Sequence, residues 1–184
     1  MKKIILSTLV VFALASCKKE SQKNDETAMV TDSISAPESA SAVAPLKMLT
    51  LDKVSEYLNK KNDTLYVTNF FATWCGPCVK EIPHFKNKID ELKGKPIKIT
   101  FISLDQKEAW NTEVPRFVAE QGIQDHTVIV DGQLMDGNFF KNNFKQWTGN
   151  AIPFTFMRKG DKTDETLGMI SEEQLNEKIN SLLK

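Results

Sequence analysis

The chain has 184 residues with 24 basic and 24 acidic side chains, so its formal net charge is +0 at pH 7. This length supports one domain with a substantial core and is short for two domains. The balanced charge excludes the strongly basic character of a nucleic-acid-binding protein, and we expect no nucleic-acid partner. The three cysteines, Cys17, Cys75 and Cys78, carry more information, because an odd number of thiols needs an explanation.

The first 16 residues have the features of an export signal. Lys2 and Lys3 form a positive start, and residues 4–14 are an apolar stretch interrupted by only two hydroxyl residues. The stretch is too short to span a bilayer, which takes about 20 apolar residues, but it has the length of a signal peptide. It ends at Leu14-Ala15-Ser16-Cys17, which resembles the lipobox of bacterial lipoproteins, whose cysteine is lipidated. We therefore predict a lipoprotein signal peptide over residues 1–16; an ordinary signal peptide with an incidental cysteine is the alternative.

Residues 17–46 are expected to form a disordered tether that is anchored by a lipid on Cys17. Between Lys18 and Pro45 the chain is rich in Ser, Ala, Glu, Thr and Asp and poor in large apolar residues. Such a segment cannot bury enough surface to offset the entropy lost on ordering. The anchor predicts an exported bacterial lipoprotein, attached to a membrane and facing the periplasm. The outer membrane and the cell surface remain open alternatives, since Lys18 does not mark retention in the inner membrane.

A folded domain is predicted over residues 47–184, and its first half alternates helix and strand. Leu51, Val54 and Leu58 recur at helical spacing, and Thr50 or Asp52 can cap this helix. The next elements, read from β-branched runs and from apolar spacing, are a buried strand over Thr64–Phe71, a helix from about Cys75 to Gly94 that Pro83 should kink, and a strand over Ile97–Leu104.

The second half continues the alternation and closes on a hairpin and a helix. We predict a helix over Glu108–Gln121 that is interrupted at Pro115, a strand over Thr127–Val130, a helix over Asn138–Trp147, strands over Pro153–Arg158 and Thr166–Ile170 joined by the polar turn Lys159–Asp164, and a last helix that opens with the capping box Ser171-Glu172-Glu173-Gln174. This order of elements predicts an α/β domain with three layers, α/β/α, around a central mixed sheet.

The pair Cys75 and Cys78 lies where a buried strand ends and a helix begins. A cysteine at a helix N-terminus meets unpaired backbone N–H groups and the positive end of the helix dipole, which stabilise a thiolate. Two intervening residues, Gly76 and Pro77, place the second thiol one turn into the helix. We therefore expect Cys75 to be the exposed nucleophile of low pKa, and Cys78 to be the buried thiol that resolves a mixed disulfide.

Two motifs resemble the thioredoxin superfamily, and specifically its TlpA/ResA-like branch of exported thiol-disulfide oxidoreductases. The run Trp74-Cys75-Gly76-Pro77-Cys78-Val79-Lys80-Glu81-Ile82-Pro83 matches the W-C-x-P-C-x-x-E-x-P pattern of that branch, and Ala151-Ile152-Pro153-Phe154-Thr155 is similar to its cis-proline loop. The resemblance implies a thioredoxin-like fold in which about Gln106–Val130 is an inserted helix-strand segment. The branch often begins with a β-hairpin, whereas the sequence here predicts a helix.

The resemblance also implies roles in substrate binding around the dithiol. Pro153 would be the cis-proline that faces the disulfide, and Ile152 would offer its backbone groups to a bound partner strand. Trp74 would pack beside the dithiol and shape access for the partner, together with Gly76 and Pro77.

A third catalytic residue is implied at Glu81. The carboxylate matches one that the branch places near the cysteines, and we expect it to act as general acid and base on Cys78, with a pKa raised by partial burial. Asn69 stands where thioredoxins bury an aspartate, and an amide cannot carry a proton at neutral pH. The alternative for Glu81 is a solvated charge on a helix face.

These features predict an enzyme that reduces disulfides of exported proteins, among which the haem-attachment thiols of apocytochrome c are one class. It would need no cofactor beyond the Cys75–Cys78 disulfide, would take electrons from a membrane thiol donor, and would act as a monomer. An oxidant or isomerase with the same dithiol is one alternative, and a non-catalytic module that binds chains in the cis-proline groove is another. A zinc site built from Cys75, Cys78, His84 and His126 is a third alternative, for which a single C-x-x-C is weak support.

Overall fold

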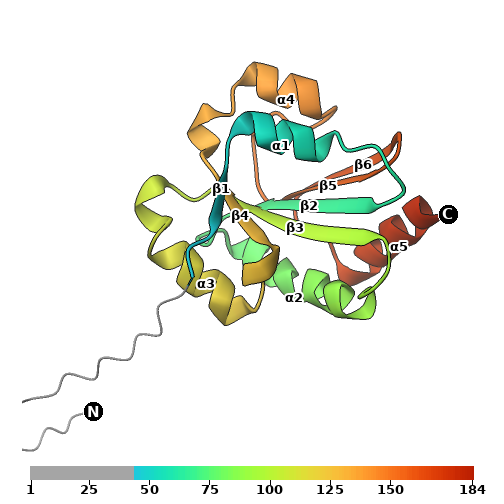
Figure 1. Ribbon diagram of the computed structural model, residues 1–184, viewed down its shortest axis with the longest axis horizontal. Coiled ribbons are helices and arrows are strands. Elements are labelled where there is room, and N and C mark those ends of the chain that lie inside the picture. The colour runs from blue at the N-terminus through green and yellow to red at the C-terminus, as the bar shows by residue number, and fades with distance from the viewer. Residues whose placement is uncertain (1–43) are drawn as a thin grey trace, which may run out of the picture. The chain divides into compact units, whose positions relative to one another are not determined.

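The computed structural model describes residues 44–184, which form one mixed six-stranded sheet with helices on both faces (Figure 1). The strands are β1 (Lys47–Leu49), β2 (Leu65–Phe71), β3 (Ile97–Ser103), β4 (Thr127–Val130), β5 (Phe154–Lys159) and β6 (Lys162–Leu167). The α-helices are α1 (Leu51–Leu58), α2 (Gly76–Glu91), α3 (Glu113–Gln121), α4 (Gly137–Asn143) and α5 (Glu172–Leu183). Short 3₁₀ turns occur at Lys107–Ala109, Gln124–His126 and Gly132–Leu134.

The order of strands across the sheet is β1-β4-β3-β2-β5-β6. Strands β1, β4, β3 and β2 are parallel, while β5 runs antiparallel to β2 and β6 antiparallel to β5. The predicted mixed sheet is therefore confirmed. The order brings the end of β2 and the start of β5 side by side near the middle of the sheet, although residues 71 and 154 lie far apart in the chain.

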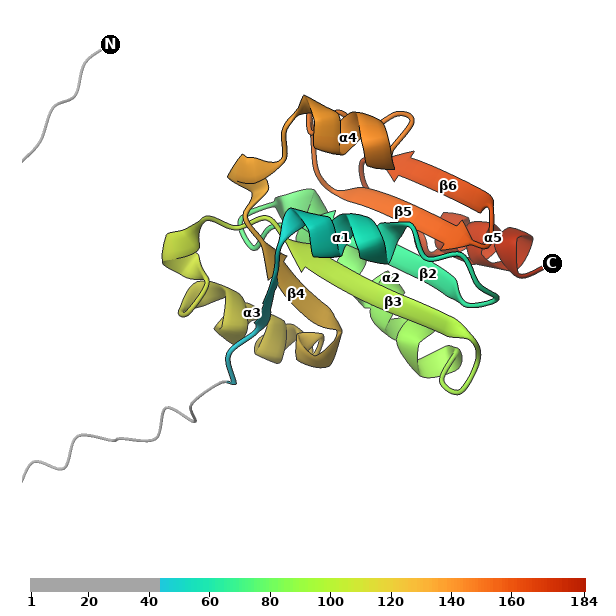
Figure 2. The ribbon, with the colours of Figure 1, turned by 45° about the horizontal axis from the view of Figure 1, so that its top comes forward.

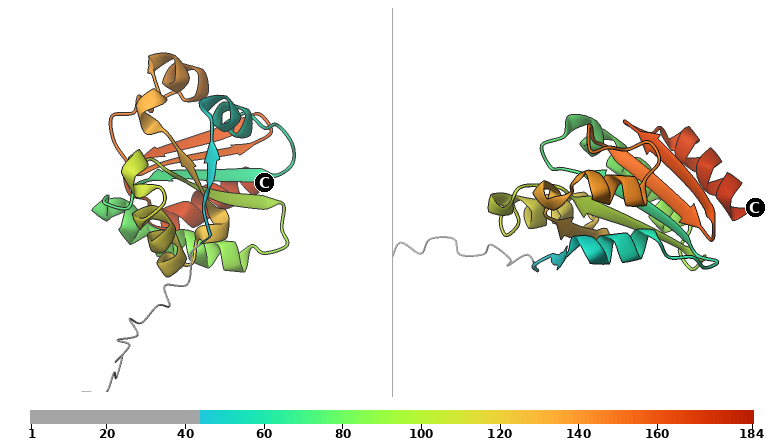
Figure 3. Two further views of the ribbon diagram at one scale, coloured as in Figure 1. Left: turned by 60° about the vertical axis from the view of Figure 1, so that its left-hand side comes forward. Right: turned by 90° about the horizontal axis from the view of Figure 1, so that it is seen from above.

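Two apolar cores fill the space between the sheet and its helices. Residues of α2, α3 and α5 pack together on one face, and residues of α1 and α4 pack on the other. Figure 2 shows α1 and α4 over one side of the sheet, and the left view of Figure 3 places α2 and α5 on the opposite side. The predicted three-layer architecture is confirmed.

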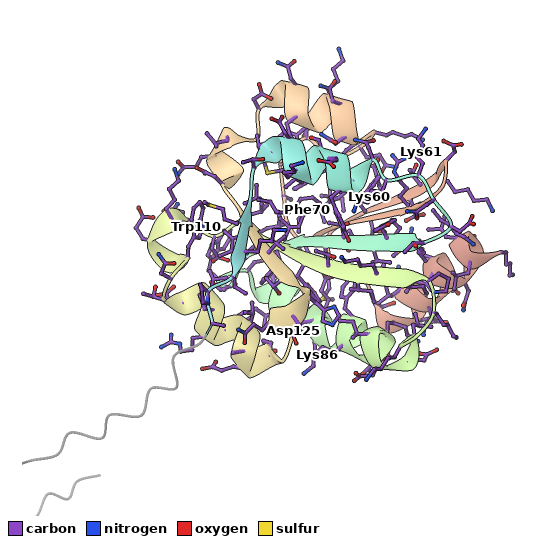
Figure 4. All side chains as sticks on the ribbon, in the orientation of Figure 1. Lys60, Lys61, Phe70, Lys86, Trp110 and Asp125 are labelled. Atoms are coloured by element: carbon purple, nitrogen blue, oxygen red, sulfur yellow. A yellow bond between two sulfur atoms is a disulfide. The ribbon has the colours of Figure 1, made fainter. Side chains whose placement is uncertain are left out.

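Strand β2 contributes to both cores because successive side chains of a strand point to opposite faces. Phe70, labelled in Figure 4, belongs to the core under α1 and α4, where its ring lies 5.7 Å from Phe144 and 4.7 Å from Trp147 between centroids. Phe71 belongs to the other core, with the cysteines and the buried face of α2. The alternation fixes which residues of β2 can reach the cysteines.

Most predicted elements are confirmed, but two helices differ from their predicted bounds. The break in the segment before β4 does not fall at Pro115: a 3₁₀ turn ends at Ala109, and α3 begins at Glu113 with Pro115 in its first turn. Proline is tolerated there because the N–H that it lacks would have no helical partner. The helix predicted to reach Trp147 ends at Asn143, since Phe144 has extended backbone angles of φ −133° and ψ 157°.

The hairpin and the start of the domain also differ from the prediction. Strands β5 and β6 are joined at Gly160–Asp161 rather than by a turn over residues 159–164, and β6 ends at Leu167. The polar residues of β6 resembled a turn because β6 is an edge strand with half-exposed side chains. The three-residue strand β1 was not predicted, and it precedes the helix that was.

The segment expected to be an insertion, Gln106–Val130, contains α3 and β4, and β4 lies between β1 and β3 in the sheet. Within residues 44–184, every helix is too short or too polar to cross a lipid bilayer. The predicted signal peptide, the lipidation of Cys17 and nearly all of the predicted tether fall outside the described residues.

Candidate active site

Cys75 and Cys78 form a disulfide at the start of α2, with their sulfur atoms 2.02 Å apart. Cys75 is the N-cap residue of the helix, and the backbone N–H of Cys78 donates to its sulfur across 3.3 Å. The same N–H and the positive end of the helix would stabilise a thiolate at Cys75 after reduction.

The two cysteines differ in exposure, but neither residue is freely exposed in the disulfide state. Cys78 is fully buried and Cys75 is 5% exposed. The expectation of an exposed Cys75 is thus wrong for the oxidised protein, because the bond draws its sulfur toward Cys78 and the loop before β5 approaches from the other side. Only Cys75 retains contact with solvent, so attack by a thiol would occur there.

The loop before β5 faces the disulfide and contains a cis peptide bond between Ile152 and Pro153. The carbonyl oxygen of Ile152 lies 3.8 Å from the Cys75 sulfur. Two hydrogen bonds hold the loop: Trp147 Nε1 donates to the carbonyl of Ala151 (2.8 Å), and the N–H of Gly168 donates to the carbonyl of Pro153 (2.9 Å). The structure therefore places Ile152 and Pro153 beside the cysteines.

A surface hollow of about 740 Å³ lies over the disulfide, and we call it the disulfide groove. Trp74, Cys75, Gly76 and Pro77 line one side of it, and residues 149–152 line another. Trp74 is 71% exposed, so its indole presents an apolar surface to solvent next to the reactive bond. Such a surface is typical of a site that binds a partner chain.

Glu81 is fully buried one turn after Cys78 and accepts two hydrogen bonds. Asn69 Nδ2 donates to its Oε1, and the backbone N–H of Ile170 donates to its Oε2, both across 2.7 Å. Burial raises the pKa of the Glu81 carboxyl to about 7, against the opposing effect of the two donors. The alternative of a solvated charge is wrong, and the side chain has a pKa suited to proton transfer near neutral pH.

Asn69 links Glu81 to β5, since its Nδ2 also lies 3.1 Å from Thr155 Oγ1. Its Oδ1 is buried and has no hydrogen-bond partner among the described residues. A buried amide oxygen without a donor is costly. A proton on the neighbouring Glu81 carboxyl would provide a donor for this oxygen.

The sequence did not reveal that Asp105 belongs to the site. Its buried carboxylate accepts from the N–H of Thr73 (3.1 Å), from Thr73 Oγ1 (2.6 Å) and from Ser103 Oγ (2.8 Å). Asp105 thereby fixes the loop just before Trp74 and Cys75. An aspartate directly after a buried strand was the available signal, but its partner lies 32 residues away in the chain.

The histidines considered for a zinc site do not join the cysteines. His84 Nδ1 lies 3.0 Å from the carbonyl oxygen of Ile170, and His126 Nδ1 lies 3.2 Å from that of Ile99. Among residues 44–184, no three His, Cys, Asp or Glu side chains gather as a metal site would require. The geometry therefore favours dithiol chemistry over metal binding at Cys75 and Cys78.

A thioredoxin family model matches residues 45–126, which include both cysteines. This part of the chain matches the thioredoxin family. The dithiol and the buried carboxylate come from one stretch of sequence, residues 75–81, and the cis-proline loop comes from a second. The family match ends before the second stretch, and the structure supplies it.

Curated relatives of this thioredoxin-family domain are named as thiol-disulfide oxidoreductases. "Thiol-disulfide oxidoreductase ResA" of Bacillus anthracis is 30% identical over 116 residues, which are 63% of this chain and 60% of that protein. "Sporulation thiol-disulfide oxidoreductase A" of Bacillus subtilis is 26% identical over 115 residues, 60% of this chain and 64% of that protein. The chain thus spans less than two thirds of the length of the relatives that it matches.

Solved structures show the same fold at lower sequence identity. A thiol:disulfide interchange protein of Chlorobium tepidum is 21% identical with a TM-score of 0.54, and the match covers 71% of this chain and 85% of that one. A DsbF homologue of Corynebacterium diphtheriae is 17% identical with a TM-score of 0.54, covering 68% and 80%. Both comparisons support a thioredoxin-like fold for this domain.

Proposed function

We propose that the protein is a thiol-disulfide oxidoreductase that reduces disulfides in polypeptide substrates. One observation carries the proposal: Cys75 and Cys78 form a disulfide at a helix N-terminus, directly opposite a cis-proline loop. The names of the curated relatives agree with this chemistry.

The reaction proceeds by two exchanges. In the first, the Cys75 thiolate attacks the substrate disulfide, forming a mixed disulfide and releasing one substrate sulfur as a thiolate that takes up a proton. In the second, Cys78 loses its proton and attacks the Cys75 sulfur, which restores the Cys75–Cys78 disulfide and releases the other substrate sulfur. The substrate gains two electrons from the dithiol, and its two sulfurs take up one proton from solvent and the one that Cys78 releases. A dithiol donor must return the two electrons and the Cys78 proton to the enzyme.

Glu81 is the proposed acceptor of the Cys78 proton. It lies three residues after Cys78 on α2, so the two side chains are neighbours on one helix face. A carboxyl with a pKa of about 7 exchanges protons at neutral pH, whereas an ordinary glutamate would be ionised.

Asn69 would support both protonation states of Glu81. With Glu81 ionised, the Asn69 amide donates to it, as in the structure. With Glu81 protonated, a rotated amide would present its otherwise unpaired Oδ1 to the new hydroxyl, and the Thr155 hydroxyl can donate or accept as needed. A neutral amide can reverse its role in this way, which explains why an asparagine suits the position.

Titration of the dithiol in glutathione buffers, read by alkylation and mass spectrometry, tests the proposal. We expect reversible two-electron chemistry with a potential near that of thioredoxin, about −270 mV, while a value near −120 mV would indicate an oxidant. A Cys75→Ser, Cys78→Ser double variant is the control and should not reduce insulin disulfides. Binding of unfolded chains without any exchange by the unmodified protein would instead favour a non-catalytic module.

The Glu81→Gln variant tests the acid-base role. We expect exchange with oxidised insulin to slow by about 10²-fold, as for loss of a general base, and the inflection near pH 7 to disappear from the rate profile. An unchanged profile would remove Glu81 from the mechanism.

Export and lipidation of Cys17 are part of the proposal, and they rest on the signal-like residues 1–16. They would place the enzyme at a membrane, where a thiol donor could recharge it and where apocytochrome c is one available substrate class. Incorporation of a clickable fatty acid in cells, lost in a Cys17→Ala variant, checks the anchor. Labelling that persists in the variant would refute it.

A further inference from the structure

A second hollow, of about 460 Å³, adjoins the disulfide groove, and its apolar wall has no role in the chemistry described so far. Met48, Leu51, Trp110, Val130 and Leu134 form this wall, and Lys107 and Asp131 stand at its rim. We call it the Met48–Leu134 hollow. Trp110, labelled in Figure 4, marks its position beside β1. The volume is within the range of about 300–1,000 Å³ that is usual for ligand pockets.

The most exposed large apolar side chains of residues 44–184 gather at these two hollows. Trp74 is 71% exposed, and Met48 and Leu134 are each 62% exposed. Trp74 lines the disulfide groove, and the other two line the Met48–Leu134 hollow. Exposed apolar groups that cluster next to a reactive site indicate a surface for binding a partner.

The two hollows are adjacent, because they share two lining residues. Lys107 and Asp131 line both of them, and their side chains form an ion pair of 2.8 Å. Lys107 Nζ also lies 5.9 Å from the centre of the Trp110 ring. A chain that leaves the disulfide groove past Lys107 and Asp131 would meet two charges that neutralise one another. Beyond this ion pair it would meet the apolar wall of the second hollow.

Hydrogen bonds connect the wall of the hollow to the loop that carries the reactive cysteine. Trp110 Nε1 donates to the carbonyl of Asp105 across 2.7 Å, and the Asp105 carboxylate holds Thr73. The indole is therefore fixed relative to Trp74 and Cys75 before any substrate arrives. A surface that is ordered in advance loses less entropy on binding than a flexible one.

We propose that the Met48–Leu134 hollow binds a large apolar side chain of the polypeptide whose disulfide is attacked by Cys75. The preferred substrates would be extended, cysteine-containing segments with a leucine, methionine or phenylalanine close to the cysteine. Alternate residues of an extended chain face the same side, so this side chain stands an even number of residues from the cysteine. The inference rests on the proposed function and assigns it a substrate class.

Peptides that each contain a single cysteine, joined to glutathione in a mixed disulfide, test the assignment. On a Ser/Thr background, a single leucine is placed two, four or six residues before or after the cysteine, and the all-polar peptide serves as reference. For each protein, the rate constant for reduction of a peptide is divided by the rate constant of the same protein with oxidised glutathione. The protein is used in its reduced, full-length form. We expect at least one leucine position to accelerate the reaction about tenfold, as burial of a leucine allows.

Two variants locate the preference. Met48→Ser combined with Leu134→Ser should abolish it, and both residues are exposed enough for serine to be tolerated. Met169→Ser is the matched control, because Met169 is 51% exposed but does not line the hollow, and it should retain the preference. The inference is overturned if no leucine position matters, if the preference survives in the double variant, or if Met169→Ser loses it equally. Failure of the unmodified protein to reduce oxidised glutathione or any peptide would instead overturn the proposed function.

Discussion

Glu81 has a carboxyl group whose ionisation is opposed by burial, so the stability of the protein should depend on pH through this residue. Its pKa is about 7 in the folded protein against 4.5 as the ordinary value. The folded state therefore holds a proton between these pH values that the unfolded state has released. Stability should decrease as pH rises from about 4.5 to 7, by up to about 3 kcal/mol, and then stay constant with respect to this group.

The Glu81→Gln variant removes that dependence. Between pH 5 and pH 8, urea unfolding of the oxidised proteins should show the unmodified protein losing about 2–3 kcal/mol relative to the variant. Glu177→Gln, at an exposed position of α5, is the control and should follow the unmodified protein. Parallel stability curves for all three proteins would show that Glu81 has an ordinary pKa.

Asp105 should stabilise the loop that carries Cys75. Asp105→Ala removes the acceptor for the N–H and the hydroxyl of Thr73 and for the hydroxyl of Ser103. Hydrogen bonds to a charged group contribute about 1.5–3 kcal/mol each, so we expect a loss of about 2–4 kcal/mol in the free energy of unfolding and slower alkylation of reduced Cys75. Asp105→Asn keeps one acceptor oxygen and should lose less. Equal stability of the alanine variant would exclude this anchoring role.

The candidate site was predictable from sequence only where its signals are local. The run from Trp74 to Pro83 encloses both cysteines and Glu81 in a few turns of chain, so the resemblance of one continuous motif related them. Asp105 and Trp110 act through partners that the fold brings near, and neither the strand pattern nor the composition of their segment indicates those contacts. The hydrogen bond from Asn69 to Glu81 could not be predicted, because it depends on how α2 packs against β2.

At the scale of elements, caps and long periodic segments were predictable, and edges were not. The capping box of α5 is confirmed at Ser171 and Gln174, because both signals lie within one turn. Strand β1 has three residues, and its hydrogen bonds depend on pairing with β4, which the local sequence cannot indicate. The aromatic residues after α4 have the spacing of a helix, and this spacing led to the prediction of a longer helix. The residues are apolar for another reason, because Phe144 and Trp147 pack in a core.

The segment between α4 and the cis-proline loop should tolerate no side chain at Gly149. Its φ is +81°, and a Cβ there would clash with the ring of Phe140. Gly149→Ala should therefore lose about 2–3 kcal/mol in urea unfolding, from backbone strain and from displacement of the ring. Gly160→Ala is the matched control, since its φ is +56° but nothing lies within 4 Å, and about 1 kcal/mol is expected. Equal losses would show that the ring moves freely.

For the molecule as a whole, the sheet order places the strands of the active site in the interior. Strands β2 and β5 each have a neighbour on both sides, while β1 and β6 form the edges. Amide hydrogen exchange, measured by mass spectrometry, should be slowest in β2 and β3, slow in β5, and much faster in β1 and β6. Exchange in β1 as slow as in β2 would contradict this order of stability.

Ile170, just before α5, is bound to α2 through both of its backbone groups. Its N–H donates to Glu81, and its carbonyl lies 3.0 Å from His84 Nδ1. The C-terminal helix is in this way tethered to the Glu81 carboxyl group. Truncations or crosslinks that displace α5 would therefore disturb the hydrogen bond from Ile170, and loss of that bond would raise the pKa of the Glu81 carboxyl further.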